Sequence, residues 1–171
     1  MGDLWKQAAR HECGHWLVGL LVGFEPGRIR RWGAQAGAEV QIDRATPTTE
    51  EARKYCEDRL KQLVAGGAAE YVSAVGEFAD EVGGNAFFSE PPEPRFASDV
   101  GRARELACVL ANMLGEPSPA LRANVLSHAW NRSGEMLQAE VKKLNALTAR
   151  VERLKEDEEV SADELRKVIR A

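Results

Sequence analysis

The sequence predicts an α+β fold that is mostly α-helical and contains one small β-sheet. Two observations lead to this prediction. Apolar residues recur at helical intervals through most of the 171 residues, whereas segments that alternate in character occur only beside the glycine-containing turn at 33–37. The length is that of one ordinary domain, which can bury a core without disulfides. We therefore expect a single domain over residues 1–171.

The first two elements are a helix and a hairpin. Residues 4–22 contain no proline and place apolar side chains at helical intervals, so they predict a helix that ends near Gly23. Segments 28–32 and 38–42 alternate in character and predict the two strands of a β-hairpin.

The middle of the chain predicts two further helices. Thr48 and Glu51 have the spacing of a capping box, in which each side chain bonds to the other residue's backbone N–H, and they predict a helix that runs to about Ala65. Two glycines follow, and the small and apolar segment 68–75 after them predicts a short buried helix.

The second half begins with an irregular segment. Residues 76–96 contain three glycines, three prolines and several acids, so we expect a long loop or a flap over a cleft. Helical periodicity returns over 99–114 and again over 119–157, where an apolar stripe marks a bundle face. Ser161 and Glu164 form a second capping box before a short final helix.

The charge balance argues against a nucleic-acid partner. The chain has 23 basic and 27 acidic side chains, a formal charge of −4, whereas nucleic-acid-binding proteins usually present a basic face. The one dense basic cluster, Arg28, Arg30 and Arg31, lies in a predicted strand, where we expect a solvated edge. No membrane span is expected, because the longest apolar stretch, 16–24, is less than half of the roughly 20 residues that a span needs.

The cysteines indicate a reducing compartment. Cys13, Cys56 and Cys108 are odd in number and widely spaced, so they form neither a CxxC pair nor a disulfide framework. The chain opens on an amphipathic segment rather than a signal peptide, and we expect a cytoplasmic protein. A glycine-rich phosphate loop is missing from the sequence, so no ATPase activity is expected.

The first predicted helix contains His11-Glu12-Cys13-Gly14-His15. Histidines at i and i+4 lie on one face of a helix, with Cβ atoms about 5–6 Å apart, so both imidazoles can reach one zinc ion. A glutamate at i+1 lies beside that face, where it can take a proton from a water on the zinc. The candidate zinc ligands are therefore His11 and His15, and the candidate catalytic base is Glu12. Chance spacing of two helix histidines is the alternative interpretation.

A catalytic zinc needs a third protein ligand and an open fourth position, and three residues are candidates for that ligand. Asp99 begins a helix just after the irregular segment, from where a carboxylate can point into a cleft. Glu70 lies in a small and apolar run, so we expect it to be buried and paired, as a carboxylate behind a ligand histidine would be. His128 stands beside Trp130 and has the features of an ordinary helix residue. The residues alone leave the choice open.

Three motifs follow one another along the chain: HECGHWLVG at 11–19, AGGAAE at 65–70 and ASDV at 97–100. In this order and spacing they resemble the peptidase region of FtsH-type proteases, the membrane-bound AAA+ zinc proteases. That family has a His-Glu-Ala-Gly-His helix, a Gly-Gly-Arg-Ala-Ala-Glu segment and a Ser-Asn-Asp-Leu segment. Residues 144–165 also resemble its C-terminal helices, so the resemblance covers nearly the whole chain. It implies a zincin-like HExxH helix, a small hairpin or sheet, and a C-terminal helical bundle.

The resemblance implies a role for each candidate residue. The zinc ligands would be His11, His15 and Asp99, and the catalytic base would be Glu12. Glu70 would be an acid that supports a ligand histidine.

The resemblance also implies how substrate binds and how the domain is divided. Val40, Gln41 and Ile42 would offer an edge strand to which an extended peptide adds by main-chain hydrogen bonds. Residues 1–115 would form the catalytic part, and 116–171 the C-terminal helices.

The chain departs from the family pattern in several places. Gly67 replaces an arginine, and Cys13 replaces an alanine. Cys13 lies roughly 200° around the helix from His11, so we expect it in the core rather than on the metal. The proline-rich segment 85–96 matches poorly and is expected to reshape or cover the cleft. The family's ATPase ring and membrane segments have no counterpart here, so only flexible segments or short peptides are expected to enter.

The leading hypothesis is an ATP-independent zinc metalloendopeptidase that hydrolyses peptide bonds in unfolded or flexible protein segments. The alternative is a non-proteolytic zinc module that binds peptides or regulates a partner, although the intact Glu12 argues against it because binding alone needs no base. A third hypothesis is a helical interaction domain without metal. No oligomeric state is inferred, because the family's hexamers depend largely on the ATPase ring.

Overall fold

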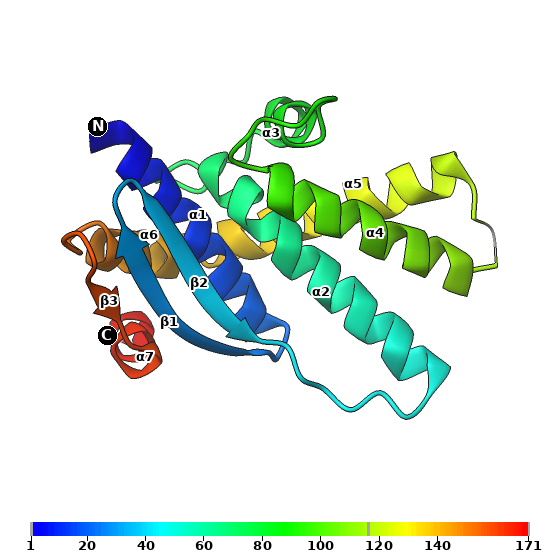
Figure 1. Ribbon diagram of the computed structural model, residues 1–171, viewed down its shortest axis with the longest axis horizontal. Coiled ribbons are helices and arrows are strands. Elements are labelled where there is room, and N and C mark those ends of the chain that lie inside the picture. The colour runs from blue at the N-terminus through cyan, green and yellow to red at the C-terminus, as the bar shows by residue number, and fades with distance from the viewer. Residues whose placement is uncertain (1, 116, 171) are drawn as a thin grey trace.

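The structure is a computed structural model that describes residues 2–115 and 117–170. Over these residues the chain is mostly helical with a small three-stranded antiparallel sheet, which confirms the predicted α+β class. The elements are α1 (Gly2–Leu21), β1 (Glu25–Trp32), β2 (Gln35–Gln41), α2 (Thr49–Glu70), α3 (Asp80–Phe87), α4 (Ala97–Met113), α5 (Pro119–Ala139), α6 (Val141–Val151), β3 (Glu159–Val160) and α7 (Ala162–Arg170). Figure 1 shows α1 at the centre of the fold, between the sheet and α2.

The predicted hairpin is present, but its turn is shorter than expected. Gly33 and Ala34 alone join the strands, and Gly33 has a φ of 61°, a conformation that favours glycine. The sheet order is β2-β1-β3, so within the described part of the chain one edge of β2 has no strand beside it. The strand ends before Ile42, which therefore lies outside the sheet.

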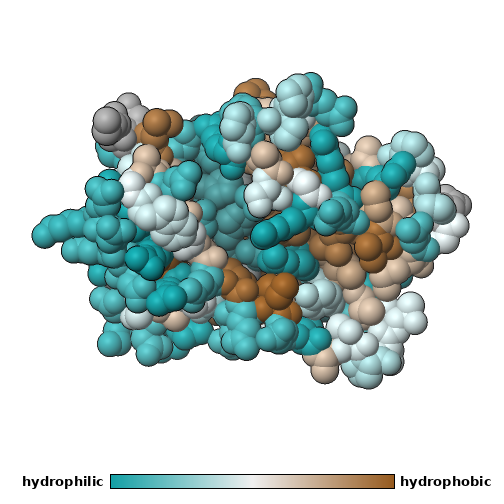
Figure 2. Space-filling view, viewed as in Figure 1, coloured by the Kyte–Doolittle hydropathy of each residue, from teal (hydrophilic) through white to brown (hydrophobic). Residues whose placement is uncertain are grey.

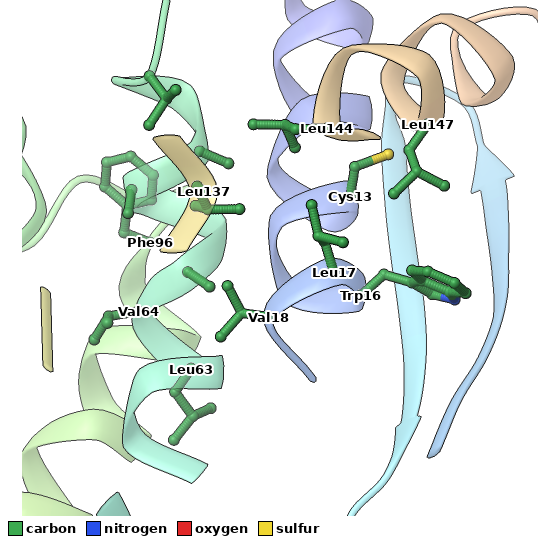
Figure 3. Packing of buried hydrophobic residues seen from close by; sticks show 14 of the residues in the cluster. Cys13, Trp16, Leu17, Val18, Leu63, Val64, Phe96, Leu137, Leu144 and Leu147 are labelled. Carbon is green, nitrogen blue, oxygen red and sulfur yellow. The ribbon is translucent and has the colours of Figure 1, made fainter. Parts of the chain in front are cut away.

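Helices α1 and α2 approach each other closely through small residues. A Cβ on Gly14 would collide with the Ala65 carbonyl and would lie 2.6 Å from the Cβ of Ala69, so the contact requires glycine. Around it, the buried side chains of α1 point toward α2 on one side and toward α6 and the sheet on the other (Figure 3). Cys13 is fully buried in this core.

The prediction of a helix end near Ala65 and a separate helix over 68–75 is wrong. Instead, α2 continues without a break through Gly66 and Gly67. Glycine in a helix interior costs roughly 1 kcal/mol relative to alanine, but packing requires it at both positions. A Cβ on Gly66 would collide with two imidazoles of α1, and a Cβ on Gly67 would collide with the ring of Phe87.

The expected loop over 76–96 is wrong in part, because this segment contains α3. Aromatic side chains hold it against the rest of the fold. Phe87 and Phe96 are fully buried, and the ring of Phe87 lies 5.2 Å from that of Trp130 on α5. The Trp130 indole also donates to the Asp80 carbonyl at 3.1 Å. Dispersed aromatic residues give no periodic signal, so the sequence pattern did not reveal them as core residues.

The single helix predicted over 119–157 is wrong as well, because two helices meet at Glu140, which has a φ of −110° and a ψ of 23°. The first, α5, packs against α2 and α4, whereas α6 packs against α1 and α7. One straight helix cannot cover both surfaces. The apolar stripe continues across the break and therefore concealed it.

Both predicted capping boxes are present. Thr48 accepts from the backbone N–H of Glu51, whose side chain accepts from the backbone of Thr48. Ser161 and Glu164 make the same reciprocal pair before α7. These local signals located the starts of two helices correctly.

One hydrophobic core includes residues from both predicted parts of the domain, such as Val64 and Leu144. The predicted boundary between those parts falls at residue 116, which lies outside the described residues. Of the helices in the described ranges, none is both long enough and apolar enough to cross a membrane.

The close contact between α1 and α2 gives a stability prediction. Gly14→Ala is expected to lower the free energy of unfolding by roughly 1–3 kcal/mol, because the new methyl group forces the helices apart. Gly101→Ala in α4 is the matched control: its Cβ meets no atom within 4 Å, so we expect a gain of roughly 0.4–1 kcal/mol. Urea denaturation measures both, and equal effects would contradict the packing argument.

Candidate metal centre

Three side chains from two distant segments meet beside α1. The Nε2 atoms of His11 and His15 are 3.0 Å apart. The Oδ2 atom of Asp99, in the first turn of α4, lies 3.0 Å from His11 Nε2 and 3.2 Å from His15 Nε2. Both histidines are buried and Asp99 is half-buried. The structure thus brings together the three residues that the resemblance implies as ligands.

The other nitrogen of each imidazole is committed to a separate partner. His15 Nδ1 lies 2.7 Å from the Gln62 carbonyl oxygen, which can only accept, so Nδ1 is the protonated nitrogen. His11 Nδ1 donates to the Glu70 carboxylate at 2.8 Å. In the neutral imidazoles both Nε2 atoms therefore present lone pairs toward each other and toward a carboxylate oxygen. Three acceptors facing one point require a cation among them.

The geometry of these acceptors suits zinc. Bonds of roughly 2.0–2.1 Å in a tetrahedron place two ligand atoms about 3.3–3.4 Å apart. The three observed separations, 3.0, 3.0 and 3.2 Å, are slightly shorter and would need only a small expansion. Two imidazoles and one carboxylate are also a common ligand set of catalytic zinc. In the described part of the chain this group has three members, which leaves a fourth position for another ligand.

A proton is the alternative cation, and the contacts within the group shift the pKa values of two of its members. Burial lowers the pKa of His11, but its hydrogen bonds to Asp99 and Glu70 outweigh burial and raise the pKa to about 9. Burial raises the pKa of Asp99, but the charge of His15 and the hydrogen bonds from both histidines hold it far below its usual value. Without metal, the protein therefore retains a proton on His11 at neutral pH, and a metal ion must displace it.

Glu70 fixes the orientation of His11 from behind. Its side chain is only 4% exposed, and its second oxygen accepts from Gln7 at 2.6 Å. Arg95 lies 3.4 Å from the same oxygen and stacks on the Phe96 ring, which itself stacks on His11. The buried carboxylate is thus neutralised and fully bonded, as expected for an acid that supports a metal-binding histidine.

Gly66 of α2 makes room for the candidate metal centre, the group formed by His11, His15 and Asp99. Its missing side chain leaves the space that both Nε2 atoms occupy. This packing explains why α2 contains a glycine about one turn before its end at Glu70. It also explains why the two glycines, taken as a helix-ending signal, placed the end of α2 too early.

Glu12 joins the metal centre to the sheet. Its Oε2 atom accepts from the backbone N–H of Ala38 on the free edge of β2, at 2.7 Å. Its other oxygen, Oε1, makes no hydrogen bond within residues 2–115 and 117–170. One oxygen therefore anchors the hairpin, and the other remains available in the cleft.

The metal centre lies in an open cleft of about 630 Å³. Figure 2 shows this hollow between the hairpin and α2 and α4, with hydrophilic residues at its visible floor, while apolar residues such as Val40 and Leu63 also line it. Of the three residues predicted as a substrate edge, Val40 lines the cleft, whereas Gln41 and Ile42 are not among its lining residues. The strand residues that border the cleft are instead centred on 35–38, because the shorter turn brings the start of β2 to this position.

Other candidate residues lie elsewhere. His128 is exposed on α5 and borders a separate cavity, so it is not a ligand of this group. The end of the irregular segment, Pro94 and Arg95, lines one side of the cleft. Arg59 and Arg102 also line the cleft, although neither was a candidate from the sequence. Charged residues on helices are usually solvated, so no sequence signal distinguished these two.

Comparison with protein-family models and with curated proteins found no match to the chain. The assignment of the site therefore depends on its geometry and on the motif resemblance.

We expect the chain to bind one zinc ion, and Asp99→Ala to weaken this binding at least about 100-fold, because the centre loses its only charged ligand. Competition with a chromophoric chelator measures the affinity. Asp163→Ala is the matched control, since that carboxylate is 86% exposed in α7. Equal affinities for the parent and Asp99→Ala would exclude Asp99 as a ligand.

Zinc affinity should also depend on pH. Because the folded, metal-free protein holds a proton on His11 with a pKa of about 9, zinc must release that proton at any lower pH. The logarithm of the affinity should rise with a slope of about one per pH unit between pH 7 and 8.5 and level off above pH 9. Calorimetry in buffers of different ionisation enthalpy counts the proton released. A flat profile would be inconsistent with competition between proton and metal.

Proposed function

We propose that this protein is an ATP-independent zinc endopeptidase that hydrolyses peptide bonds in unfolded or flexible segments. One observation supports this proposal most directly: a carboxylate with a free oxygen, Glu12, lies in an open cleft on the same helix as two imidazoles that converge with Asp99. Hydrolysis needs both a base and an accessible metal position, whereas a purely structural site needs neither.

When bound, zinc would lower the pKa of a coordinated water and polarise the carbonyl of the scissile amide. The chain's own residues supply the rest. His11, His15 and Asp99 hold the metal, and Glu70 keeps His11 in the tautomer that offers Nε2. Glu12 accepts a proton at Oε1 and can return it to the leaving amine. Its Oε2 remains bonded to Ala38, which keeps the base oriented.

The free edge of β2 supports binding of an extended peptide. An unpaired strand edge offers backbone N–H and C=O groups, and a peptide that adds to it gains main-chain hydrogen bonds without a sequence requirement. Residues 35–38 on this edge line the cleft beside the candidate metal centre, and because the Ala38 N–H already donates to Glu12, a peptide would pair with the other backbone groups of the edge. A folded protein has few extended segments available for such pairing, so the substrates are flexible chains or short peptides.

The resemblance to FtsH-type peptidases supports the same proposal. The motifs that carry the resemblance, around His11, Glu70 and Asp99, are those that meet in the structure. One departure also has a physical explanation: at Gly67, where the family has arginine, any side chain would collide with Phe87 of α3. We infer that α3 occupies the space that an arginine would fill.

A second candidate is a non-proteolytic zinc module that binds peptides. The bond from Ala38 N–H to Glu12 favours it, because it gives Glu12 a structural role in docking the hairpin. The two functions differ in whether a bound peptide is cleaved.

Glu12→Gln separates the two candidates. Glutamine keeps an oxygen that can accept from Ala38, so the hairpin and zinc affinity should be preserved, while peptide turnover should fall by about 10²–10⁴-fold because an amide cannot act as a base. The measurement is cleavage of a fluorogenic peptide and of unfolded casein by zinc-loaded protein, with a chelator-treated sample alongside. Glu105→Gln, an exposed α4 residue, is the control. If the zinc-loaded parent binds these peptides without cleaving them, the binding module is correct.

A further inference from the structure

Three arginines line the cleft, but only one is neutralised. Arg95 pairs with Glu70 and Glu93. Arg59 on α2 and Arg102 on α4 have no carboxylate within 4.0 Å among the described residues. Other partly buried arginines in the fold bond either to a carboxylate, as Arg44 does to the buried Asp58 at 2.8 Å, or to backbone carbonyls, as Arg10 does.

Both unpaired arginines lie next to the metal centre. Arg102 follows Asp99 by three residues in α4, so the two side chains are on the same face of that helix. Arg59 donates to the side chain of Gln62, whose backbone carbonyl holds His15. Arg102 is therefore within one helical turn of the candidate ligand Asp99. Arg59 is within one turn of Gln62, the residue that holds His15.

Arg59 is half-buried and has no carboxylate partner within residues 2–115 and 117–170, which is an unfavourable state for a charge. Burial lowers its pKa, and the positive charge of Arg102 lowers it further, while the charges of Tyr55 and Asp99 act in the opposite direction. The hydrogen bond to Gln62 holds the guanidinium in one orientation. An oriented and partly desolvated guanidinium that pairs with no carboxylate is well suited to receive an anion.

We propose that Arg59 and Arg102 form a carboxylate-binding subsite, so that this cleft selects peptides with a carboxylate close to the bond to be cleaved. This inference rests on the proposed function, because it names the substrate class of the same site. The carboxylate would come from an aspartate or glutamate side chain or from the C-terminus of the peptide. The planar guanidinium fork matches carboxylate geometry, and two such groups favour a negative over a neutral side chain at that position.

The test compares matched peptides. A flexible fluorogenic peptide is prepared with glutamine at every central position, and glutamate then replaces each glutamine in turn. A second pair differs only in a free or an amidated C-terminus. For each protein, kcat/KM is measured for every peptide, and the ratio of the acidic to the neutral peptide is taken within one preparation, so that the fraction of folded protein cancels.

We expect a preference of about tenfold for a carboxylate at one position, consistent with a partly exposed charge-assisted pair. The ratio should fall to near one in the double variant Arg59→Gln/Arg102→Gln. Arg53→Gln is the matched control on α2, since Arg53 is exposed and lies near Glu57 instead of the cleft. It should retain both the parent rate and the ratio. The position of the preferred glutamate, or the C-terminal pair, identifies the source of the carboxylate.

Three outcomes would overturn the subsite: equal rates for acidic and neutral peptides in the parent, a preference that survives in the double variant, or an equal loss for all peptides in that variant. The last outcome would indicate a general role in hydrolysis. Binding of the same labelled peptides to zinc-loaded Glu12→Gln, followed by fluorescence anisotropy, tests the subsite without hydrolysis. A parent that cleaves no peptide would contradict the proposed function, and the anisotropy ratio would still support or reject the arginine subsite.

Discussion

The centre of this fold depends on three lone pairs directed at one point. The Nδ1 atoms of His11 and His15 are committed as donors to Glu70 and to the Gln62 carbonyl, so in the neutral imidazoles both Nε2 atoms face Asp99 as acceptors. These three acceptor atoms repel one another unless a cation lies between them. The rest of the architecture keeps these groups together: α1 and α2 approach through glycine, and α4 begins where its first turn places Asp99 against α1.

The supports of the metal centre also position the cleft. Glu12 bonds to the free edge of β2. This bond fixes the position of β2, which borders the cleft, relative to α1, which carries the imidazoles. On the opposite side, Arg95 bonds to Glu70 and stacks on Phe96, so the irregular segment before α4 is attached to the same buried carboxylate. A disturbance at either support would therefore move both the candidate ligands and the strand edge that borders the cleft.

The parts of the site that could be predicted from sequence are those with a local periodic basis. The spacing of His11, Glu12 and His15 is a property of one helix, and the α1 prediction was confirmed. Asp99 and Glu70 are distant along the chain, so the residues alone made them candidates and only the motif resemblance assigned them roles. Arg59 and Arg102 had no signal, because a charged residue on a helix face is usually solvated. The break between α5 and α6 was also hidden, because the apolar stripe continues through it. What changes at the break is the packing partner, from α2 and α4 to α1 and α7.

The largest failure of local rules occurs beside the metal centre. Two consecutive glycines normally weaken a helix, yet α2 continues through them because Gly66 admits the imidazoles and Gly67 admits Phe87. Arg59 adds a second local cost, a half-buried cation without a carboxylate. A metal site that served stability alone would be closed by four protein ligands and would need neither an adjacent base nor unpaired charges. Here three ligands face a cleft that also contains a free carboxylate oxygen and two unpaired arginines, an arrangement that favours a bound and reacting peptide over a structural role.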